Sequence, residues 1–424
     1  MAGVQGGIGG ESGPLRRRSR LAVALIAAAW LALPATAGAA AVTEFRIRTA
    51  ASIPAGITVG PDGAIWFTEE NGNNIGRLAL DGTLDEYPIP TPFSRPAEIA
   101  AGPDGALWFT EPGAAPLPKI GRITTAGVVT DEYELPLGSG PDGITAGPDG
   151  AIWLTLTGTR KIGRMTVDGT CCDEYELVEG FLPGDITPGP DGRLWFTESE
   201  PANKVGAISM SGEIKEYDVP GTGPSGIAAS GGALWFTMHH SDRIGRIPTF
   251  GLPITDFPVP AGAGPSGIAL GSDGALWFTE QTAGKIGRMT TTGRITEFAL
   301  PDPRSEPSGI VAGPDGAMWF TEEIGNQIGR IEAGSSTGAA TSSPASLPVA
   351  TPTGSTTSTQ KKKKKRACRV PRLRGLPVRK ARKKLRRARC RYRLSGRGRV
   401  VSTRPQAGIR TRSRVQVRAR PRPR

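Results

Sequence analysis

A glutamate follows the tripeptide Trp-Phe-Thr at several points of this chain of 424 residues. Carboxylates bind divalent cations, and carboxylates gathered in one place repel one another unless a cation or a basic ligand neutralises them. Two interpretations stay open: a cation-attracting acidic face, or glutamates that are screened by solvent or accept hydrogen bonds from loop amides. In chain order, the residues at this point of the motif and its variants are Glu69, Glu111, Leu156, Glu198, Met238, Glu280 and Glu322.

The chain contains two histidines, His239 and His240, which directly follow the segment Trp235 to Met238. A loop histidine can act as a general base or bind a metal, although exposed loop histidines commonly do neither. The sequence contains no G-x-S-x-G elbow, no Walker loop and no H-E-x-x-H motif. The enzyme classes that depend on these motifs therefore receive no support from the sequence.

Seven tryptophans mark the repeat that must position these side chains. Successive members of the series are 42, 45, 42, 40, 42 and 42 residues apart. A period near 40 residues with several short strands per unit is typical of propeller blades. The sequence therefore predicts an all-β fold, a seven-bladed β-propeller over residues 41–332. Packing between the blades explains the repetition of these residues without any ligand: Trp66, Trp108, Trp153, Trp195, Trp235, Trp277 and Trp319.

Each repeat reads as four strands. A short apolar strand is followed by a Pro-Asp-Gly turn, the tryptophan strand, a strand such as Lys285-Ile-Gly-Arg-Met289, and an outer strand that contains an aromatic residue. One outer strand, Thr43-Glu44-Phe45, precedes the first tryptophan, and none follows Ile331. We therefore predict that residues 43–45 complete the last blade and close the ring.

The chain reverses at every turn of a four-stranded blade. The end of the second strand therefore lies on the same face as the loop that leads into the first strand of a blade, which we call the lead-in loop. We expect a small-molecule or peptide ligand to bind on this face, near the mouth of the central channel. Each lead-in loop contains one proline of the series Pro54, Pro96, Pro141, Pro183, Pro224, Pro265 and Pro307.

The repeated G-I-x-x-G-P-D-G-x-[IL]-W-F-T-E, followed by N-x-I-G-R-I and T-E-[FY], resembles the streptogramin lyase (virginiamycin B lyase) family over Ala41 to Glu332. The resemblance implies a seven-bladed ring and a Mg²⁺-dependent elimination that opens the ester-linked ring of type B streptogramins. It also implies a base histidine in a Glu-Pro-His-Gly-Ile lead-in loop, and a second histidine in the lead-in loop of the preceding blade. Glutamates hold the metal in that family.

This chain departs from the family pattern at the base. Ser308 and Ser266 stand at the two histidine positions, and a serine hydroxyl without an activating neighbour is a poor base. Glu306 and Glu322 match the family's metal-binding glutamates and are the candidate Mg²⁺ ligands. The pair His239 and His240 would replace the lost histidines only if its loop folded over the channel.

The two ends of the chain differ from the repeat region. Residues 1–40 contain four arginines, an apolar run from Leu21 to Leu33 and an A-x-A site, which together predict a signal peptide. An uncleaved membrane anchor is the alternative. Residues 41–332 contain 19 Lys and Arg against 38 Asp and Glu, so the repeat region is acidic. We expect an exported, monomeric protein, extracellular or associated with the cell wall.

The C-terminal part is strongly basic. Residues 333–366 form a disordered Ser/Thr/Pro linker that ends in a lysine run, and residues 361–424 hold 29 Lys and Arg without an acidic residue. From residue 367 onward, Val-Pro-x-Leu-x-Gly, Ala-x-x-x-Leu and Pro-x-Ala-Gly resemble a small α+β PASTA domain. That resemblance and the charge predict binding to peptidoglycan or anionic wall polymers, and no specific binding of nucleic acid.

Cys171 and Cys172 are neighbours within a blade turn, where they form either a vicinal disulfide or two thiols. Two functions remain for the whole chain. The first is an exported propeller that binds a ligand at the cell envelope with its catalytic histidines replaced. The second is a Mg²⁺-dependent carbon–oxygen lyase that linearises a cyclic depsipeptide or lactone antibiotic.

Overall fold

The computed structural model describes residues 42–177, 182–199, 201 and 203–333, together with the backbone of five short strands near the C-terminus. Contacts divide the chain into two compact units, Met1–Ala339 and Ala340–Arg424. The predicted signal peptide, most of the linker and the helix expected in the C-terminal domain lie outside the described residues. No helix among the described residues is long and apolar enough to cross a membrane.

Seven four-stranded antiparallel sheets make up the first unit, which confirms the predicted seven blades. Blade 1 contains β2 (Pro54–Val59), β3 (Ile65–Glu69), β4 (Asn74–Leu78) and β5 (Leu84–Pro88); blade 2 contains β6 (Ile99–Ala101), β7 (Leu107–Glu111), β8 (Lys119–Ile123) and β9 (Val129–Glu134). Blade 3 contains β10 (Pro141–Ala146), β11 (Ile152–Leu156), β12 (Lys161–Met165) and β13 (Asp173–Glu176); blade 4 contains β14 (Pro183–Pro188), β15 (Leu194–Glu198), β16 (Lys204–Ile208) and β17 (Ile214–Asp218).

The remaining blades follow the same order of strands. Blade 5 contains β18 (Pro224–Ser230), β19 (Ala233–Met238), the short 3₁₀ helix η1 (His239–Ser241), β20 (Arg243–Pro248) and β21 (Thr255–Pro258). Blade 6 contains β22 (Pro265–Leu270), β23 (Leu276–Glu280), β24 (Lys285–Met289) and β25 (Ile295–Ala299). Blade 7 contains β26 (Pro307–Ala312), β27 (Met318–Glu322) and β28 (Gln327–Ile331), and its outer strand is β1 (Val42–Arg46).

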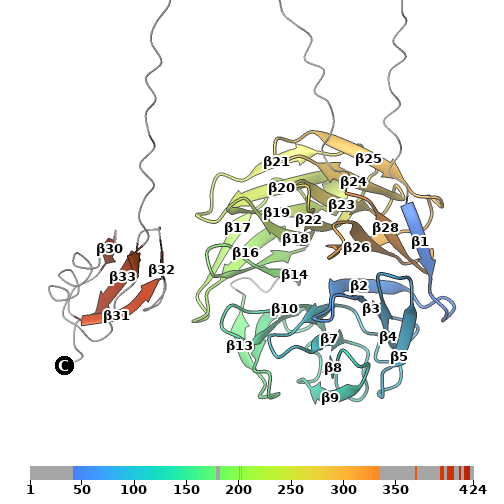
Figure 1. Ribbon diagram of the computed structural model, residues 1–424, viewed down its shortest axis with the longest axis horizontal. Helices are drawn as coiled ribbons and strands as arrows, with labels where there is room; N and C mark the ends of the chain where they lie inside the picture. Colours follow the sequence, from blue (N-terminus) through green and yellow to red (C-terminus); the bar gives the residue numbers. More distant parts are fainter. Residues whose placement is uncertain are drawn as a thin grey trace, which may run out of the picture. The chain divides into compact units, whose positions relative to one another are not determined.

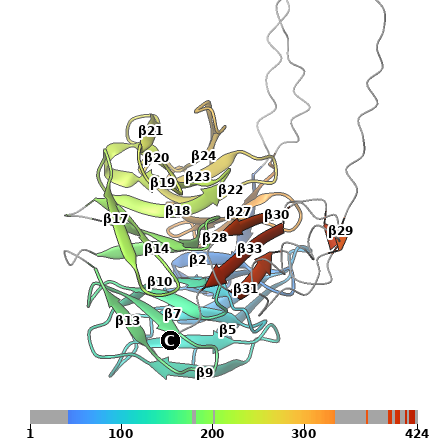
Figure 2. The same ribbon diagram turned by 90° about the vertical axis from the view of Figure 1, so that its left-hand side faces the viewer.

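The pairing of β1 with β28 confirms the predicted closure of the ring. The two strands are antiparallel, with Phe45 opposite Ile328 and Val42 opposite Ile331. The first strands β2, β10, β14, β18, β22 and β26 lie around the middle of the ring, and the outer strands lie at its periphery (Figure 1). In the view turned by 90°, β10 and β14 again lie inward of β13 and β17 (Figure 2).

The tryptophans form the core that the sequence predicts. All seven are at most 2% exposed, and each stacks on the aromatic residue of its own outer strand at centroid distances of 5.4–5.8 Å. Each also packs against a neighbouring blade; Trp66, for example, shares a cluster with Phe109 and Ile99 of blade 2. Burial of one such side chain stabilises the fold by roughly 4–6 kcal/mol before chain entropy is counted.

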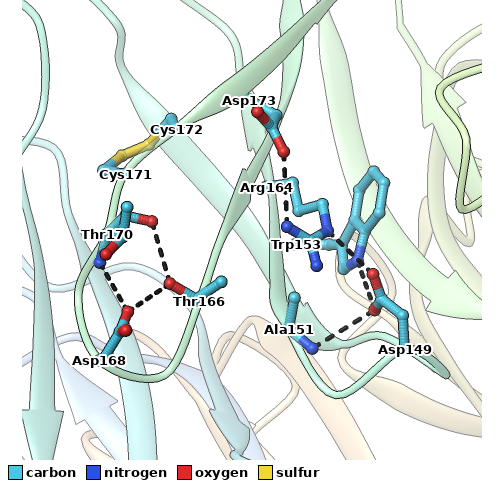
Figure 3. Close-up of polar contacts among 10 residues, drawn as sticks. All are labelled: Asp149, Ala151, Trp153, Arg164, Thr166, Asp168, Thr170, Cys171, Cys172 and Asp173. Carbon is cyan, nitrogen blue, oxygen red and sulfur yellow. Dashed lines mark hydrogen bonds and ion pairs between the residues drawn. A yellow bond between two sulfur atoms is a disulfide. The ribbon is translucent and has the colours of Figure 1, made fainter.

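The Pro-Asp-Gly turn anchors the tryptophan through its aspartate. In blade 3, Trp153 Nε1 donates to Asp149 Oδ1 at 3.1 Å, and Arg164 Nε donates to Asp149 Oδ2 at 2.8 Å (Figure 3). Five other blades have the same Asp–Trp bond, at 3.0–3.2 Å. Gly150 follows with φ +81°, a conformation that glycine adopts at little cost. The repeated Pro-Asp-Gly turn therefore has a structural role, which is to hold the tryptophan in place.

The threonine of Trp-Phe-Thr joins neighbouring blades. Thr237 Oγ1 donates to the Ser266 carbonyl of the next blade at 2.6 Å, and Thr321 Oγ1 donates to the Ala55 carbonyl across the closure at 2.8 Å. Thr68, Thr197 and Thr279 form equivalent bonds at 2.7 Å. Hydrogen bonds between buried groups fix the relative positions of the first strands, and these strands surround the central axis.

The C-terminal unit contains β29 (Cys368–Arg369), β30 (Tyr392–Ser395), β31 (Arg399–Arg404), β32 (Arg410–Thr411) and β33 (Val415–Arg420). β33 lies between β30, to which it is parallel, and β31, to which it is antiparallel.

Candidate functional site

A cavity of about 530 Å³ lies at the centre of the ring. The first strands of all seven blades, or the residue directly before them, contribute to its lining. The proline that begins each first strand or precedes it is followed by two positions that open towards the cavity in most blades. In blades 2, 3 and 4 one of these positions holds a carboxylate, and in blades 5, 6 and 7 the first holds a serine, whereas the second is glycine in five of the seven blades.

Blades 2, 3 and 4 place three carboxylates in the cavity lining. They are Glu98, Asp142 and Asp185, one from each blade. Asp185 Oδ2 accepts a 2.8 Å hydrogen bond from the amide of Ile227, whereas Asp142 has no hydrogen-bond partner among the described residues. Solvent reaches these side chains only partially, because protein surrounds them on the other sides.

The three carboxylates influence one another. Burial, with the charges of Asp185 and Asp142, raises the pKa of Glu98 well above its usual value. Burial and the charge of Asp185 raise the pKa of Asp142 to about 6. Burial also raises the pKa of Asp185, although two backbone amides oppose this shift. The cavity therefore has an acidic arc in which the negative charges are mutually unfavourable.

Blades 5, 6 and 7 line the cavity with serines instead. Ser225, Ser266 and Ser308 occupy the position directly after the lead-in proline. The structure thus places Ser266 and Ser308 together on one cavity, as their positions in the repeat suggested. No histidine, lysine or arginine lines this cavity in the part of the chain that the structure describes.

The repeated glutamates do not form an acidic face, which corrects that interpretation. Glu69, Glu111, Glu198, Glu280 and Glu322 are 0% exposed. They lie inside the blades because the end of the second strand is covered by the lead-in loop and the outer strand. Each of them faces a carboxylate of the outer strand of its own blade, such as Glu132 for Glu111 and Glu44 for Glu322.

Burial raises the pKa of all five glutamates, and the facing outer-strand carboxylate adds to the shift. The pKa rises to about 7 for Glu69 and Glu322, and to about 8 for Glu111, Glu198 and Glu280. Glu111, Glu198 and Glu280 are thus mostly protonated at neutral pH, whereas Glu69 and Glu322 are protonated in part. The alternative interpretation, that the repeated glutamates accept hydrogen bonds from loop amides, does not hold for Glu111 and Glu322. Both carboxyl oxygens of these two residues lack a hydrogen-bond partner among the described residues.

The two candidate metal ligands differ in exposure, although Pro307, which follows Glu306, pairs with Glu322 in the β26–β27 register. Glu306 is exposed in the lead-in loop of blade 7, whereas Glu322 is buried beside Ser305 and Glu44. The next residue, Glu323, is the carboxylate that comes near Glu306: its backbone amide donates to the Glu306 carbonyl at 3.1 Å. Burial raises the pKa of Glu323, the Ser308 hydroxyl opposes the shift, and Glu306 adds to it.

The histidines do not fold over the channel. His239 and His240 form most of η1, with their rings edge to face at 5.2 Å. The His239 ring interacts with the backbone of Gly264 and Pro265 in the lead-in loop of blade 6, and burial followed by the neighbouring His240 lowers its pKa. Neither histidine lines the central cavity. They therefore do not occupy the place of the two family histidines.

Comparison with known proteins decides the family. The chain matches the virginiamycin B lyase family over residues 40–234 and 228–362. The chain belongs to this family. The crystal structure of selenomethionine-substituted virginiamycin B lyase from Staphylococcus aureus is 41% identical, with a TM-score of 0.64, and the match covers 69% of this chain and 99% of that one.

Two further structures of the family are similar to the chain. A streptogramin B lyase structure is 39% identical, with a TM-score of 0.65, and the match covers 69% of this chain and 97% of that one. A catalytically inactive histidine-to-alanine variant of the S. aureus virginiamycin B lyase, solved with quinupristin, is 40% identical, with a TM-score of 0.64 and coverage of 69% and 99%.

Within this virginiamycin B lyase-like propeller, reasoning from the sequence missed four residues of the site. The repeat pattern does not predict Glu98, Asp142 and Asp185, because the corresponding positions are not acidic in most of the blades. Their signal was present in the sequence, since each interrupts the Pro-x-Gly-Ile pattern of a lead-in loop or directly follows the proline. Glu323 was overlooked because Glu322 occupies the repeated position, and only the fold shows which of the two adjacent side chains turns into the blade.

Proposed function

We propose that this member of the virginiamycin B lyase family is a binding protein that holds its ligand in the central cavity without performing the elimination. The observation that carries the proposal is the cavity lining: Ser266 and Ser308 stand where the family resemblance places histidines, and no described histidine faces the cavity. A serine hydroxyl accepts a proton poorly at neutral pH.

Two further facts support the proposal. One S. aureus relative is catalytically inactive after a single histidine-to-alanine substitution. In that protein the loss of one histidine side chain is therefore enough to abolish catalysis. The fold of the family does not by itself transfer its reaction to every member. The serine side of the cavity offers hydroxyl groups that can bind polar atoms of a ligand.

A Mg²⁺-dependent carbon–oxygen lyase acting on a cyclic depsipeptide or lactone is the second candidate. Glu306, Glu323 and the Ser308 hydroxyl are oxygen donors near one another, and oxygen donors suit Mg²⁺, which keeps several waters in its shell. When bound, Mg²⁺ stabilises negative charge that develops on a carbonyl substrate. Glu306, Glu323 and Ser308 would supply oxygen ligands to the metal, but no described histidine lines the cavity to take the proton.

The test is incubation of the full chain with a type B streptogramin and MgCl₂, followed by liquid chromatography and mass spectrometry. We expect the antibiotic to keep its retention time and mass. Elimination would give a linear product of the same mass that elutes at a different time. Such a product, formed by the native chain and lost in Glu323→Gln but not in Glu70→Gln, would establish the lyase and overturn the binding proposal.

We further propose that the protein is exported and that its basic C-terminal domain, residues 367–424, holds it to peptidoglycan or anionic wall polymers. The support is the leader-like segment of residues 1–40 and the 29 basic residues after residue 360. A pull-down with purified cell wall is expected to retain the full chain at low salt and to release it as salt rises. No retention at low salt would contradict the attachment.

A further inference from the structure

We propose that the acidic arc of the central cavity, formed by blades 2, 3 and 4, binds an organic cation that carries an apolar body. The inference rests on the proposed binding function and names the chemical class of the ligand. It concerns residues outside the serine positions and outside the cluster of Glu306, Ser308 and Glu323. Charge, cavity shape and exposed apolar side chains each contribute to the argument.

The charged side chains that line the cavity are all acidic, and they lie on one side of it. Glu98, Asp142 and Asp185 come from three consecutive blades, and no described basic side chain lines the cavity to neutralise them. The Asp142 carboxylate is only partly exposed and has no hydrogen-bond partner among the described residues. A partly desolvated carboxylate without a partner is unfavourable in the free protein, and an ammonium or guanidinium donor would satisfy it.

The geometry favours an organic cation over a metal ion. Among the described residues no three carboxylate, histidine or cysteine side chains lie close enough together to hold a metal. The three cavity carboxylates are instead distributed over three blades around a space of about 530 Å³. A protonated amine has several N–H donors and can serve separated acceptors, while its carbon skeleton fills the remaining volume.

Exposed apolar side chains occur in the lead-in loops of the same three blades. Phe93, Leu137 and Leu182 are 83%, 77% and 40% exposed, and they precede β6, β10 and β14 by a few residues. Blades 2, 3 and 4 therefore each supply one carboxylate to the cavity and one exposed apolar side chain to the face on which the cavity begins. Exposed apolar groups beside a polar cavity are typical of a ligand-binding face.

Protonation offers an independent readout. The titratable groups that line the cavity are Glu98, Asp142 and Asp185. Burial raises the pKa of all three, and repulsion from neighbouring carboxylates adds to the shift for Glu98 and Asp142. An alkylammonium ligand stays charged from pH 5 to pH 8, so any loss of affinity on acidification must come from protonation of the carboxylates. We expect affinity for the cation to fall as the pH decreases through about 6, the pKa of Asp142.

The experiment compares three probes with one apolar body: 4-phenylbutylamine, 4-phenylbutanol and 4-phenylbutyrate. Each is titrated into the full chain at pH 7.5, with calorimetry or ligand-observed NMR as the readout. We expect the amine to bind about tenfold or more tightly than the alcohol, and the carboxylate to bind most weakly. Equal affinity of the amine and the alcohol, or no binding of the amine, would overturn the proposal.

Matched variants in blades 2 and 3 locate the effect. Asp142→Asn removes a charge without breaking a hydrogen bond, and Asp131→Asn removes one from the exposed outer strand β9. Leu137→Ser removes the apolar side chain of the lead-in loop, and Val128→Ser changes a 56% exposed side chain in the turn between β8 and β9. We expect Asp142→Asn to weaken amine binding about tenfold and Leu137→Ser about threefold, with both controls unchanged.

Two outcomes separate this inference from the proposed function. Equal weakening by Asp131→Asn and Asp142→Asn would show attraction by net charge alone and would overturn the site. A linear streptogramin product would overturn the binding function, whatever the amine titration shows. Thermal unfolding of each variant, monitored by circular dichroism, identifies a loss of affinity that merely reflects a loss of fold.

Discussion

At the scale of single residues, the residues that repeat in the blades and the residues that line the cavity are different ones. The residues that recur across the blades hold each blade together, as the tryptophan and threonine of all seven blades and the turn aspartate of six blades do. The residues that differ between blades, such as Glu98, Asp142 and Ser308, line the cavity. A residue's frequency in the repeat therefore indicates a structural role, and a departure from the repeat indicates a candidate for ligand binding.

The buried glutamates have a measurable consequence for stability. Each has a folded pKa above its unfolded value, so the folded state binds protons that the unfolded state has released. The stability they contribute is fully present below about pH 4.5, and it is lost as the pH rises towards 8. We expect the melting temperature of the protein to fall from pH 5 to pH 9 in a thermal denaturation series.

Substitution of one of these glutamates tests that account. Glu111→Gln replaces a carboxyl group that is mostly protonated at neutral pH with a neutral group of similar shape. We expect the variant to lose less stability than the native chain between pH 6 and pH 9. Exposed Glu134→Gln serves as the control, and a variant with an unchanged pH profile at position 111 would show that this carboxyl group is ionised in the fold.

Sequence reasoning succeeded at this scale only in part. It predicted the buried tryptophans correctly, and it assigned Ser266 and Ser308 to the histidine positions of the family. It put the repeated glutamates at the channel mouth, because strand order alone gives the face on which a residue lies. Whether a side chain then points into the blade or towards the axis depends on the pleat and on the covering loop, and the repeat pattern does not contain that information.

At the scale of elements, the turn between the first and second strands is the unit that sets the position of each tryptophan. Trp153 is held by Asp149, which is in turn held by Arg164 of β12 (Figure 3). Although burial alone would raise the pKa of Asp149, hydrogen bonds from Arg164 and Trp153 lower it. The turn thereby links three strands of one blade through a single carboxylate.

Removal of that carboxylate is expected to destabilise blade 3. Asp149→Ala leaves the buried indole N–H without its acceptor, which costs about 1–3 kcal/mol. The measurement is the free energy of unfolding from urea denaturation, with exposed Asp173→Ala as the control on the outer strand. A loss no larger than that of the control would show that water replaces the carboxylate at no cost.

The number and order of strands could be predicted because tryptophan spacing, turn residues and alternating patterns agree with one another. Boundaries and exceptions were harder to predict. Blade 5, for example, has Gly231 where the other blades have the turn aspartate, and it still forms the same four strands. Blade 5 packs against its neighbouring blades without the turn aspartate. Contacts between blades cannot be read from the sequence of one repeat.

At the scale of the whole molecule, the ring is held closed by β1. This strand comes from the beginning of the described chain and completes blade 7, where Phe45 stacks on Trp319 at a centroid distance of 5.4 Å. Thr321 adds a hydrogen bond to Ala55 of blade 1 across the same closure. The closure therefore combines the pairing of β1 with β28 and side-chain contacts between residues more than 260 positions apart.

Weakening of the closure is expected to destabilise the entire ring. Phe45→Ala removes the stacking partner of Trp319 and should lower the free energy of unfolding by about 2–4 kcal/mol. Phe250→Ala, at a residue that is 78% exposed, is the control of equal chemistry. Equal stability of the two variants would show that the remaining contacts of β1 are sufficient to close the ring.

The separation of scaffold positions from lining positions bears on how such rings diversify. In blades 2 to 7 one side chain close after the lead-in proline supplies the polar group that lines the cavity, and it can change chemistry while the hydrogen bonds and aromatic stacks behind it stay intact. A ring built from repeated blades thus offers about one such position per blade, and substitutions can alter it blade by blade. New ligand preferences can accordingly arise by substitution within a preserved frame, and an ancestral reaction can disappear while its architecture persists.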